Sequence, residues 1–143
     1  MQKEMDRIHK KLKMIHNAFE EKRNRNLLQF NLTSSQMDVL LYLNFHEGEV
    51  HQREIEKYFG LKNPTVTGIL NRLEEKGFIV RRTHPNDRRF RMIELTEKSS
   101  NMLTQLCEEA TQMDERICSC MTDEERVVLG GLLDRILNTL SEM

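Results

Sequence analysis

The sequence predicts a mainly α-helical fold with one small β-hairpin. Apolar residues recur at spacings of three and four along most of the 143 residues, which is the period of one helix face. Two β-like runs, Phe78–Arg82 and Phe90–Leu95, flank a segment rich in turn-forming residues. Just before them, the short turn Leu61–Lys62 separates two amphipathic helices. Three helices followed by a hairpin form a winged helix-turn-helix, here flanked by further helices.

The first helix is predicted over residues 5–19, and the polar run that follows is compatible with its extension. Its apolar face is expected to consist of Met5, Ile8, Leu12, Ile15 and Phe19. The stretch Thr33–Gln36 then predicts a capping box, in which each of the two end residues bonds the backbone amide of the other. We expect it to open a second helix that ends near Glu47–Gly48.

The middle of the chain predicts the helix-turn-helix. Glu49–His51 is expected as a short edge strand, and Gly60 is expected to stop the helix Gln52–Phe59, because glycine favours a left-handed C-terminal cap. The pair Asn63-Pro64 predicts the next helix start, with Asn63 as the N-cap and Pro64 at the first helical position. The inward side of this third helix is expected to be Val66, Ile69, Leu70 and Leu73.

The chain returns to helix over residues 96–121, and a second predicted capping box, Thr122–Glu125, opens a last helix. Both helices carry long apolar seams, formed by Leu103, Leu106, Ala110, Met113 and Ile117 and then by Val128, Leu129, Leu132, Leu133, Ile136, Leu137 and Leu140. A small winged unit cannot cover so much apolar surface, which indicates an association surface. We therefore predict a helical dimerisation region (residues 1–30 and 98–143) around a winged helix-turn-helix domain (residues 31–97). The alternative is a monomer whose long helices fold back.

The third helix turns small and hydrogen-bonding residues outward. They are Thr65, Thr67, Gly68, Asn71 and Arg72. An ordinary solvated helix face is usually rich in Glu and Lys, whereas this one has no acid before Glu74. Small residues let a helix approach base edges in the major groove of double-stranded DNA. The pattern therefore favours a DNA-reading helix.

The hairpin carries a cluster of arginines. They are Arg81, Arg82, Arg88, Arg89 and Arg91. Like charges this close repel unless an anion lies across them, and arginine suits the negative potential of a narrow minor groove. Asp87 is placed to accept a hydrogen bond from a nearby guanidinium and to fix its direction. The alternative is a mobile solvated loop with weak surface ion pairs.

The formal net charge of −1 hides a strong asymmetry. Residues 51–91 carry a net charge of +5, and residues 92–143 carry −7. A basic middle indicates a nucleic-acid surface, and an acidic end would stay off the phosphate backbone. The alternative is that the acidic and basic faces only neutralise each other.

Several other classes are excluded or disfavoured. The sequence has no phosphate-binding glycine loop, nucleophile elbow or His-Glu-x-x-His motif, so we expect no enzyme. No apolar run approaches the ~20 residues of a membrane span, and no secretory signal is visible, so we expect a cytoplasmic protein without a membrane partner. Three cysteines, Cys107, Cys118 and Cys120, are too few for a disulfide framework and are expected to be buried and structural. The scattered histidines predict no metal site, and we expect no cofactor.

Several segments in this order resemble the MarR family of bacterial transcription regulators. They are Leu32–Gln36, Leu61–Thr67, Leu70–Ile79, Asn86–Arg89 and Ile93–Lys98. The resemblance implies a homodimer on a near-palindromic operator, with the third helix in the major groove and the hairpin wing in the minor groove. It makes Arg89 the wing-tip arginine and Asp87 its partner. Gly68 stands where the family often has a larger polar residue, which removes one base contact.

The resemblance also implies repression as the default and release by a small lipophilic or phenolic effector. No cysteine lies near the first helix, where the peroxide-sensing branch of the family places its thiol. The full set of expected DNA contacts is Ser35, Lys62, Asn63, Thr65, Thr67, Gly68, Asn71, Arg72, Arg82, Asp87, Arg88, Arg89 and Arg91. The competing hypothesis is a winged-helix protein-interaction module, an anti-repressor or adaptor, for which the arginine-rich wing has no evident use.

Overall fold

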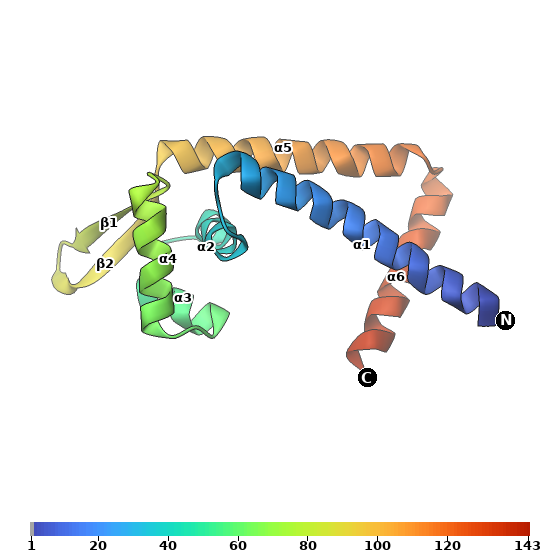
Figure 1. The fold of residues 1–143 in the computed structure, drawn as a ribbon, viewed down its shortest axis with the longest axis horizontal. Helices are drawn as coiled ribbons and strands as arrows, with labels where there is room; N and C mark the ends of the chain where they lie inside the picture. The colour runs from blue at the N-terminus through green and yellow to red at the C-terminus, as the bar shows by residue number, and fades with distance from the viewer. Residues whose placement is uncertain (1) are drawn as a thin grey trace. The chain divides into compact units, whose positions relative to one another are not determined.

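The computed structural model describes residues 2–143, with side chains described from Arg7 onward. Within them lie six helices and two strands (Figure 1). In chain order these are α1 (Gln2–Phe30), α2 (Ser34–Phe45), α3 (Gln52–Phe59), α4 (Asn63–Glu75), β1 (Ile79–His84), β2 (Asp87–Leu95), α5 (Glu97–Ser119) and α6 (Asp123–Ser141). The mainly α-helical fold with a hairpin wing is therefore confirmed. The side chain of Met5, predicted on the first helix face, lies outside the described residues.

The chain divides within α5 into two compact units, Met1–Ser100 and Asn101–Met143. The first unit holds the core, which α2, α3, α4 and the start of the hairpin build. Its fully buried side chains include Val39, Leu40, Ile55, Val66, Leu70, Leu73, Phe78 and Ile79. In Figure 1, α4 runs beside the hairpin, and α3 lies next to the N-terminal end of α4. Because three apolar positions of α4 face this core, its opposite side remains available for a partner.

The predicted helix boundaries hold where a local hydrogen bond determines them. Thr33 and Gln36 form the capping box of α2 in both directions, at 3.2 and 3.1 Å. Gly60 adopts φ 63° and ψ 32° at the end of α3, a left-handed conformation that costs a residue with a Cβ. The end of α2 comes slightly earlier than predicted, at Phe45 with His46 as its C-cap.

The predicted start of α4 is wrong by one residue. Lys62 is the N-cap, and Asn63 is already helical. The side chain of Asn63 makes no capping bond; its Nδ2 instead donates to Glu56 Oε1 at 2.7 Å. The Asn63 side chain thus bonds a carboxylate on the neighbouring helix, which sequence spacing cannot reveal. Ile69, predicted to face inward, is only half buried.

The wing differs from its prediction in the length of its strands. Its strands run on to His84 and from Asp87, so the turn is reduced to Pro85–Asn86. The antiparallel register is regular up to Thr83, which pairs with Arg91, and then jumps to His84 with Asp87. The three residues between the last two pairs on β2, residues 88–90, therefore bulge out of the ladder. The predicted edge strand Glu49–His51 is reduced to a single bridge between His51 and Met92.

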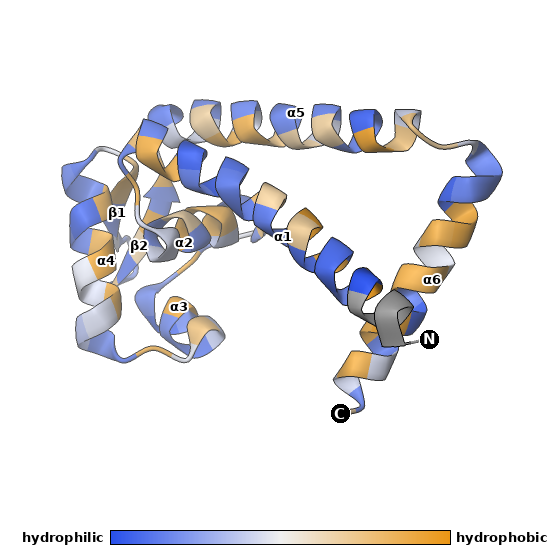
Figure 2. Cartoon of the chain, turned by 45° about the vertical axis from the view of Figure 1, so that its right-hand side comes forward, coloured by the Kyte–Doolittle hydropathy of each residue, from blue (hydrophilic) through white to orange (hydrophobic). Residues whose placement is uncertain are grey.

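The second unit exposes most of its apolar side chains. No residue of α6 is buried, and its apolar stripe is visible in Figure 2. Thr122 Oγ1 accepts from the Glu125 amide at 3.2 Å, but only this half of the predicted second capping box forms among the described residues. The expectation of buried cysteines is wrong for the single chain, because Cys107 and Cys120 are exposed. Helical periodicity placed them on a long helix but could not say whether anything covers it.

Candidate nucleic-acid interface

The outward side of α4 is the centre of the candidate interface. Thr65, Gly68, Asn71 and Arg72 are exposed, as predicted, opposite the buried apolar positions. No atom lies within 4 Å of the place that a Cβ on Gly68 would occupy, so the helix is open to close approach there. Thr67 differs from the prediction, since it is half buried and turned toward α3.

A polar network joins α3 to the N-terminal turn of α4. Gln52 Nε2 donates to Thr67 Oγ1 at 2.8 Å and to Glu56 Oε1 at 3.2 Å. Asn63 Nδ2 donates to the same Glu56 oxygen at 2.7 Å. Thr67 and Asn63, both predicted as DNA contacts, therefore also hold the two helices of the helix-turn-helix at a fixed crossing.

Arg81 joins the wing to α4. Its Nε and Nη2 donate to the two carboxylate oxygens of Glu74 at 3.0 and 3.2 Å, and Nη2 also donates to Asn71 Oδ1 at 2.7 Å. Only 14% of the Arg81 side chain is exposed. The hydrogen bond from Arg81 holds the pKa of Glu74 below its usual value. Arg81, the wing arginine nearest the core, therefore bonds other residues of the protein and fixes the wing against α4.

Arg82 and Arg89 each form an ion pair with a carboxylate, although only the pair of Arg89 was predicted. Arg82 Nε donates to Glu94 Oε2 across the hairpin at 2.9 Å. Asp87 accepts from the backbone N–H of Arg89 at 3.0 Å and from its guanidinium at 3.2 and 3.3 Å. These bonds lower the pKa of Asp87. The predicted Asp87–Arg89 pair is therefore present, and it directs a guanidinium whose side chain is 87% exposed.

A hollow of about 480 Å³ lies between the start of α3, the start of α4 and the bulge of β2. Its lining residues are His51, Gln52, Arg53, Glu56, Asn63, Arg88, Arg89, Phe90 and Arg91. The structure thus brings Asn63 together with three predicted wing arginines. Arg53, Arg88 and Arg91 form no ion pair or side-chain hydrogen bond among the described residues, and Glu56, the only acid, is already engaged by Gln52 and Asn63. Unpaired guanidinium groups around one hollow make it a site for anions.

Arg53 is the residue that sequence reasoning missed. It is exposed at the second position of α3, a helix of only eight residues. So short a helix does not define in advance which side meets the wing, and the hairpin lies some 35 positions further along the chain. No local signal in the sequence could therefore have grouped Arg53 with the wing arginines.

The remaining predicted contacts lie on the α2 side of α4. Thr65, Gly68 and Arg72 line a hollow of about 320 Å³ together with residues of α2 and its N-cap. Ser35, in the first turn of α2, and Lys62, the N-cap of α4, are both exposed. Both side chains are accessible to a partner.

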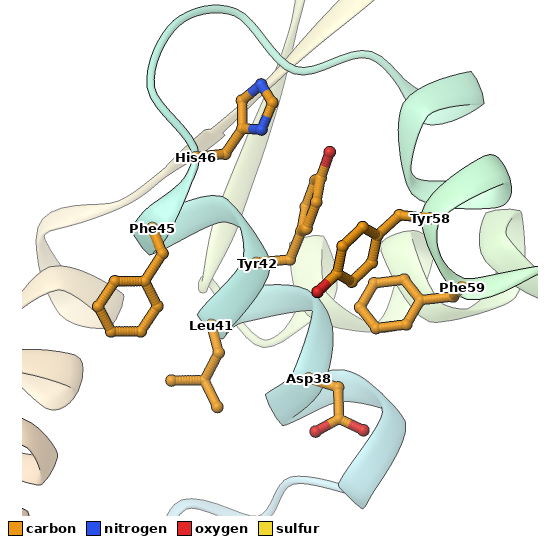
Figure 3. Close-up of a pocket in the computed structure, with 7 residues that line it drawn as sticks. All are labelled: Asp38, Leu41, Tyr42, Phe45, His46, Tyr58 and Phe59. Carbon is orange, nitrogen blue, oxygen red and sulfur yellow. The ribbon is translucent and has the colours of Figure 1, made fainter. Parts of the chain in front are cut away.

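An aromatic hollow of about 410 Å³ lies between α2 and α3, away from these residues (Figure 3). It is lined by Asp38, Leu41, Tyr42, Phe45, His46, Tyr58 and Phe59. The rings of Tyr42 and Tyr58 have centroids 4.6 Å apart, and those of Tyr58 and Phe59 are 4.8 Å apart. Burial raises the pKa of the Tyr42 hydroxyl, and the nearby Glu54 carboxylate adds to the effect. The hollow offers aromatic faces and a hydroxyl to a small molecule.

Among the residues that the structure describes, no three His, Cys, Asp or Glu side chains gather in a way that suits a metal ion. Within the same part of the chain, every helix is too short or too polar to cross a membrane.

The structure is similar to solved structures of MepR from S. aureus. MepR from S. aureus, in complex with DNA, is 28% identical; the match covers 90% of this chain and 96% of MepR, with a TM-score of 0.82. MepR bound to ethidium bromide is also 28% identical, with 90% and 93% of the two chains covered and a TM-score of 0.77. The fold, the open face of α4 and the basic wing define the class: a winged helix-turn-helix transcription regulator, not an enzyme.

Sequence comparison narrows this class to one family. The sequence profile of the MarR family matches residues 30–89. YwoH, an uncharacterized HTH-type transcriptional regulator of Bacillus subtilis, is 31% identical over 117 residues, which cover 82% of this chain and 84% of YwoH. MhqR, an HTH-type transcriptional regulator of the same organism, is 25% identical over 126 residues, or 87% and 86% of the two chains. The chain belongs to the MarR family.

Proposed function

We propose that the protein is a sequence-specific repressor that binds double-stranded DNA as a homodimer and is released by a small lipophilic or phenolic ligand. The observation that carries DNA binding is the anion site formed by Arg53, Arg88 and Arg91 beside the open face of α4. A phosphodiester strand in that hollow satisfies the three guanidinium groups and brings α4 to the major groove. Arg89, directed by Asp87, then reaches the minor groove.

The predicted contact residues divide by role in this arrangement. Thr65, Asn71 and Arg72 read or approach base edges, while Gly68 leaves room for them. Backbone contacts come from α2, the N-terminus of α4 and the wing, through Ser35, Lys62, Asn63, Arg82, Arg88 and Arg91. The structure of MepR with DNA supports a DNA-bound state for this fold.

A homodimer explains the apolar stripe of α6. Val128, Leu132, Leu137 and Leu140 are all more than 45% exposed, and no residue of this helix is buried. An unburied leucine stripe is unfavourable in water, and a second copy covers it with like chemistry. Residues 1–30 and 98–143 then form the dimerisation region around a DNA-binding domain of residues 31–97. Two-fold symmetry sets two α4 helices about 34 Å apart, matching successive major grooves of a near-palindromic operator.

The aromatic hollow between α2 and α3 supports a small effector. Ligand pockets typically enclose ~300–1,000 Å³ with mainly apolar linings, and this hollow of about 410 Å³ falls in that range. The structure of MepR with ethidium bromide supports binding of a planar lipophilic molecule by a relative. A ligand here contacts α2 and α3 together, and α3 positions α4 through the Gln52 network. Binding is therefore coupled to the orientation of the reading helix.

Salt dependence tests the DNA-binding proposal. Fluorescence anisotropy with duplex DNA at several salt concentrations measures the slope of log K against log salt. The slope is negative, and each lost phosphate contact reduces its magnitude by about 0.9, so Arg53→Ala and Arg88→Ala each make it shallower by about 1.8 in a dimer with two equal sites. Arg116→Ala, on the exposed side of α5, is the matched control and leaves the slope unchanged. A flat salt response of the unaltered protein would instead favour an adaptor that binds other proteins.

Two further measurements test the assembly and the effector. Sedimentation equilibrium gives a dimer at micromolar concentration, and Leu132→Glu converts it to a monomer; a monomeric parent protein would contradict the proposal.

The effector is tested by adding phenol, catechol or ethidium to the protein bound to its operator and measuring the release of DNA. We expect these probes to release the protein. Tyr58→Ala weakens release while leaving ligand-free DNA binding intact, and equal release of both proteins would remove the aromatic hollow from consideration.

A further inference from the structure

The amide of Asn71 has a defined orientation because its partner is an arginine. Arg81 Nη2 lies 2.7 Å from the Asn71 side chain. A guanidinium group has five donors and no acceptor, so the atom that faces it must be the amide oxygen. The Asn71 Nδ2 group therefore points away from the wing, and no hydrogen bond to it is recorded among the described residues.

Arg81 itself cannot swing away easily. Both oxygens of Glu74 accept from it at 3.0 and 3.2 Å, and its side chain is 14% exposed. A charge-assisted, two-pronged pair holds a guanidinium in one plane. Arg81 is thus a positioning residue, which acts on the outer face of α4 through Asn71 without needing to touch a nucleic acid.

The open surroundings of Asn71 make its free donor usable. Asn71 is exposed, and Gly68 lies three residues earlier on the same outward face of α4. Because nothing occupies the space beside Gly68, a base edge can approach the helix axis closely there. The free Nδ2 of Asn71 then faces a base with two hydrogen atoms to donate.

The chemistry of the base edges determines which base suits this group. Asparagine usually selects adenine by pairing its oxygen and nitrogen with the N6 donor and the N7 acceptor. Here Arg81 occupies the oxygen, so the pair of groups that adenine requires is incomplete. Guanine presents two acceptors, O6 and N7, in the major groove, and both match a lone –NH₂ group.

We propose that Arg81 makes Asn71 a hydrogen-bond donor in the major groove, so that the operator carries guanine rather than adenine opposite Asn71. The inference rests on the proposed function, in which α4 reads the major groove. It assigns base specificity to a residue of the wing that contacts no base. It also gives the Asn71-Arg81-Glu74 cluster a role beyond stability.

Selection of bound duplexes from a random-sequence library, followed by sequencing, tests the proposal. The unaltered protein enriches guanine at one position of each half-site, and Asn71→Ala loses the preference at that position only. Arg81→Met frees the amide oxygen and shifts the same position toward adenine by about fivefold or more, the lower end of what one two-pronged contact contributes. Glu75→Gln, at the next and exposed position of α4, leaves the hydrogen bonds of Arg81 intact and is the control, which retains guanine.

Asn71→Asp provides a second test that does not depend on the folding of the Arg81 variant. It keeps the contact with Arg81 but presents an acceptor where Nδ2 stood, so the preference shifts from guanine to cytosine, whose N4 is a donor. Adenine at this position in the unaltered protein, or an unchanged preference in Asn71→Asp, would overturn the inference. A protein that binds no duplex DNA overturns the proposed function as well, whereas a protein that selects a site insensitive to Asn71→Ala overturns the inference alone.

Discussion

Ser99 joins the base of the wing to the start of α5, and its replacement by alanine tests how the DNA-binding unit is held together. The side chain is completely buried. Its Oγ donates to the carbonyl oxygen of Phe78, the residue before β1, at 2.5 Å and accepts from the N–H of Thr96 at 3.0 Å. Ser99→Ala removes both bonds without adding volume, together with the contacts of Oγ with the Thr96 carbonyl oxygen at 3.0 Å and with Thr96 Oγ1 at 3.3 Å.

The cost of this change follows from what the two partners retain. The Thr96 N–H also donates to the Phe78 carbonyl at 3.2 Å, so neither group is left wholly without a partner. We therefore use the net value of about 1 kcal/mol per hydrogen bond and not the larger cost of an orphaned group. Ser99→Ala is expected to lower the free energy of unfolding by about 2 kcal/mol and Tm by roughly 6–8 °C.

Urea unfolding followed by circular dichroism, at one fixed protein concentration, measures this effect. The midpoint falls while the slope m stays constant, because the surface exposed on unfolding is unchanged. Ser119→Ala is the matched control on the same helix, since its exposed hydroxyl donates only to the Arg116 carbonyl one turn back, and it costs less than about 0.5 kcal/mol. Equal stability losses in the two variants would refute the reasoning.

Three more outcomes follow from the geometry. Asp87→Ala leaves thermal stability unchanged, because Arg89 is exposed and a surface ion pair contributes little. The same change weakens DNA binding in a gel shift, because the Arg89 guanidinium loses its fixed orientation. A large fall in Tm would contradict this reasoning. Arg81 lowers the pKa of Glu74, so their pair stabilises the fold fully at pH values above 4.5, the ordinary pKa of a glutamate. This stabilisation is lost as the pH falls through the lowered pKa. Glu74→Gln therefore makes the stability in urea less dependent on pH below 5. Gly60→Ala costs about 1 kcal/mol in the same urea assay, since its φ of 63° disfavours a Cβ, and an unchanged midpoint would argue against the left-handed cap.

The helices and their ends were largely predictable because local interactions determine them. The capping box of Thr33 and Gln36 requires only four consecutive residues, and Gly60 requires only its own backbone freedom. Asn63 shows where this reasoning stops. Its sequence signature for an N-cap is strong, but Glu56 on the preceding helix offers its side chain a carboxylate at 2.7 Å.

The candidate site was predicted in outline and corrected in its details. The basic wing and the small outward residues of α4 could be identified from type and spacing alone. The sequence could not show which arginines already have partners, because Glu74 and Glu94 bond them from separate elements. Arg53 was missed for the same reason, since it meets the wing only when the hairpin has folded back beside α3.

By itself, the sequence determined the order of the elements, the apolar faces, the reversal at the hairpin and the basic character of the middle third, since each depends on residues within a few positions of one another. The tertiary structure alone decided which guanidinium groups remain available for an anion and which way the Asn71 amide points. Those properties depend on hydrogen bonds between side chains of separate elements. Such contacts depend on the packing and register of whole helices and strands, which no local pattern specifies.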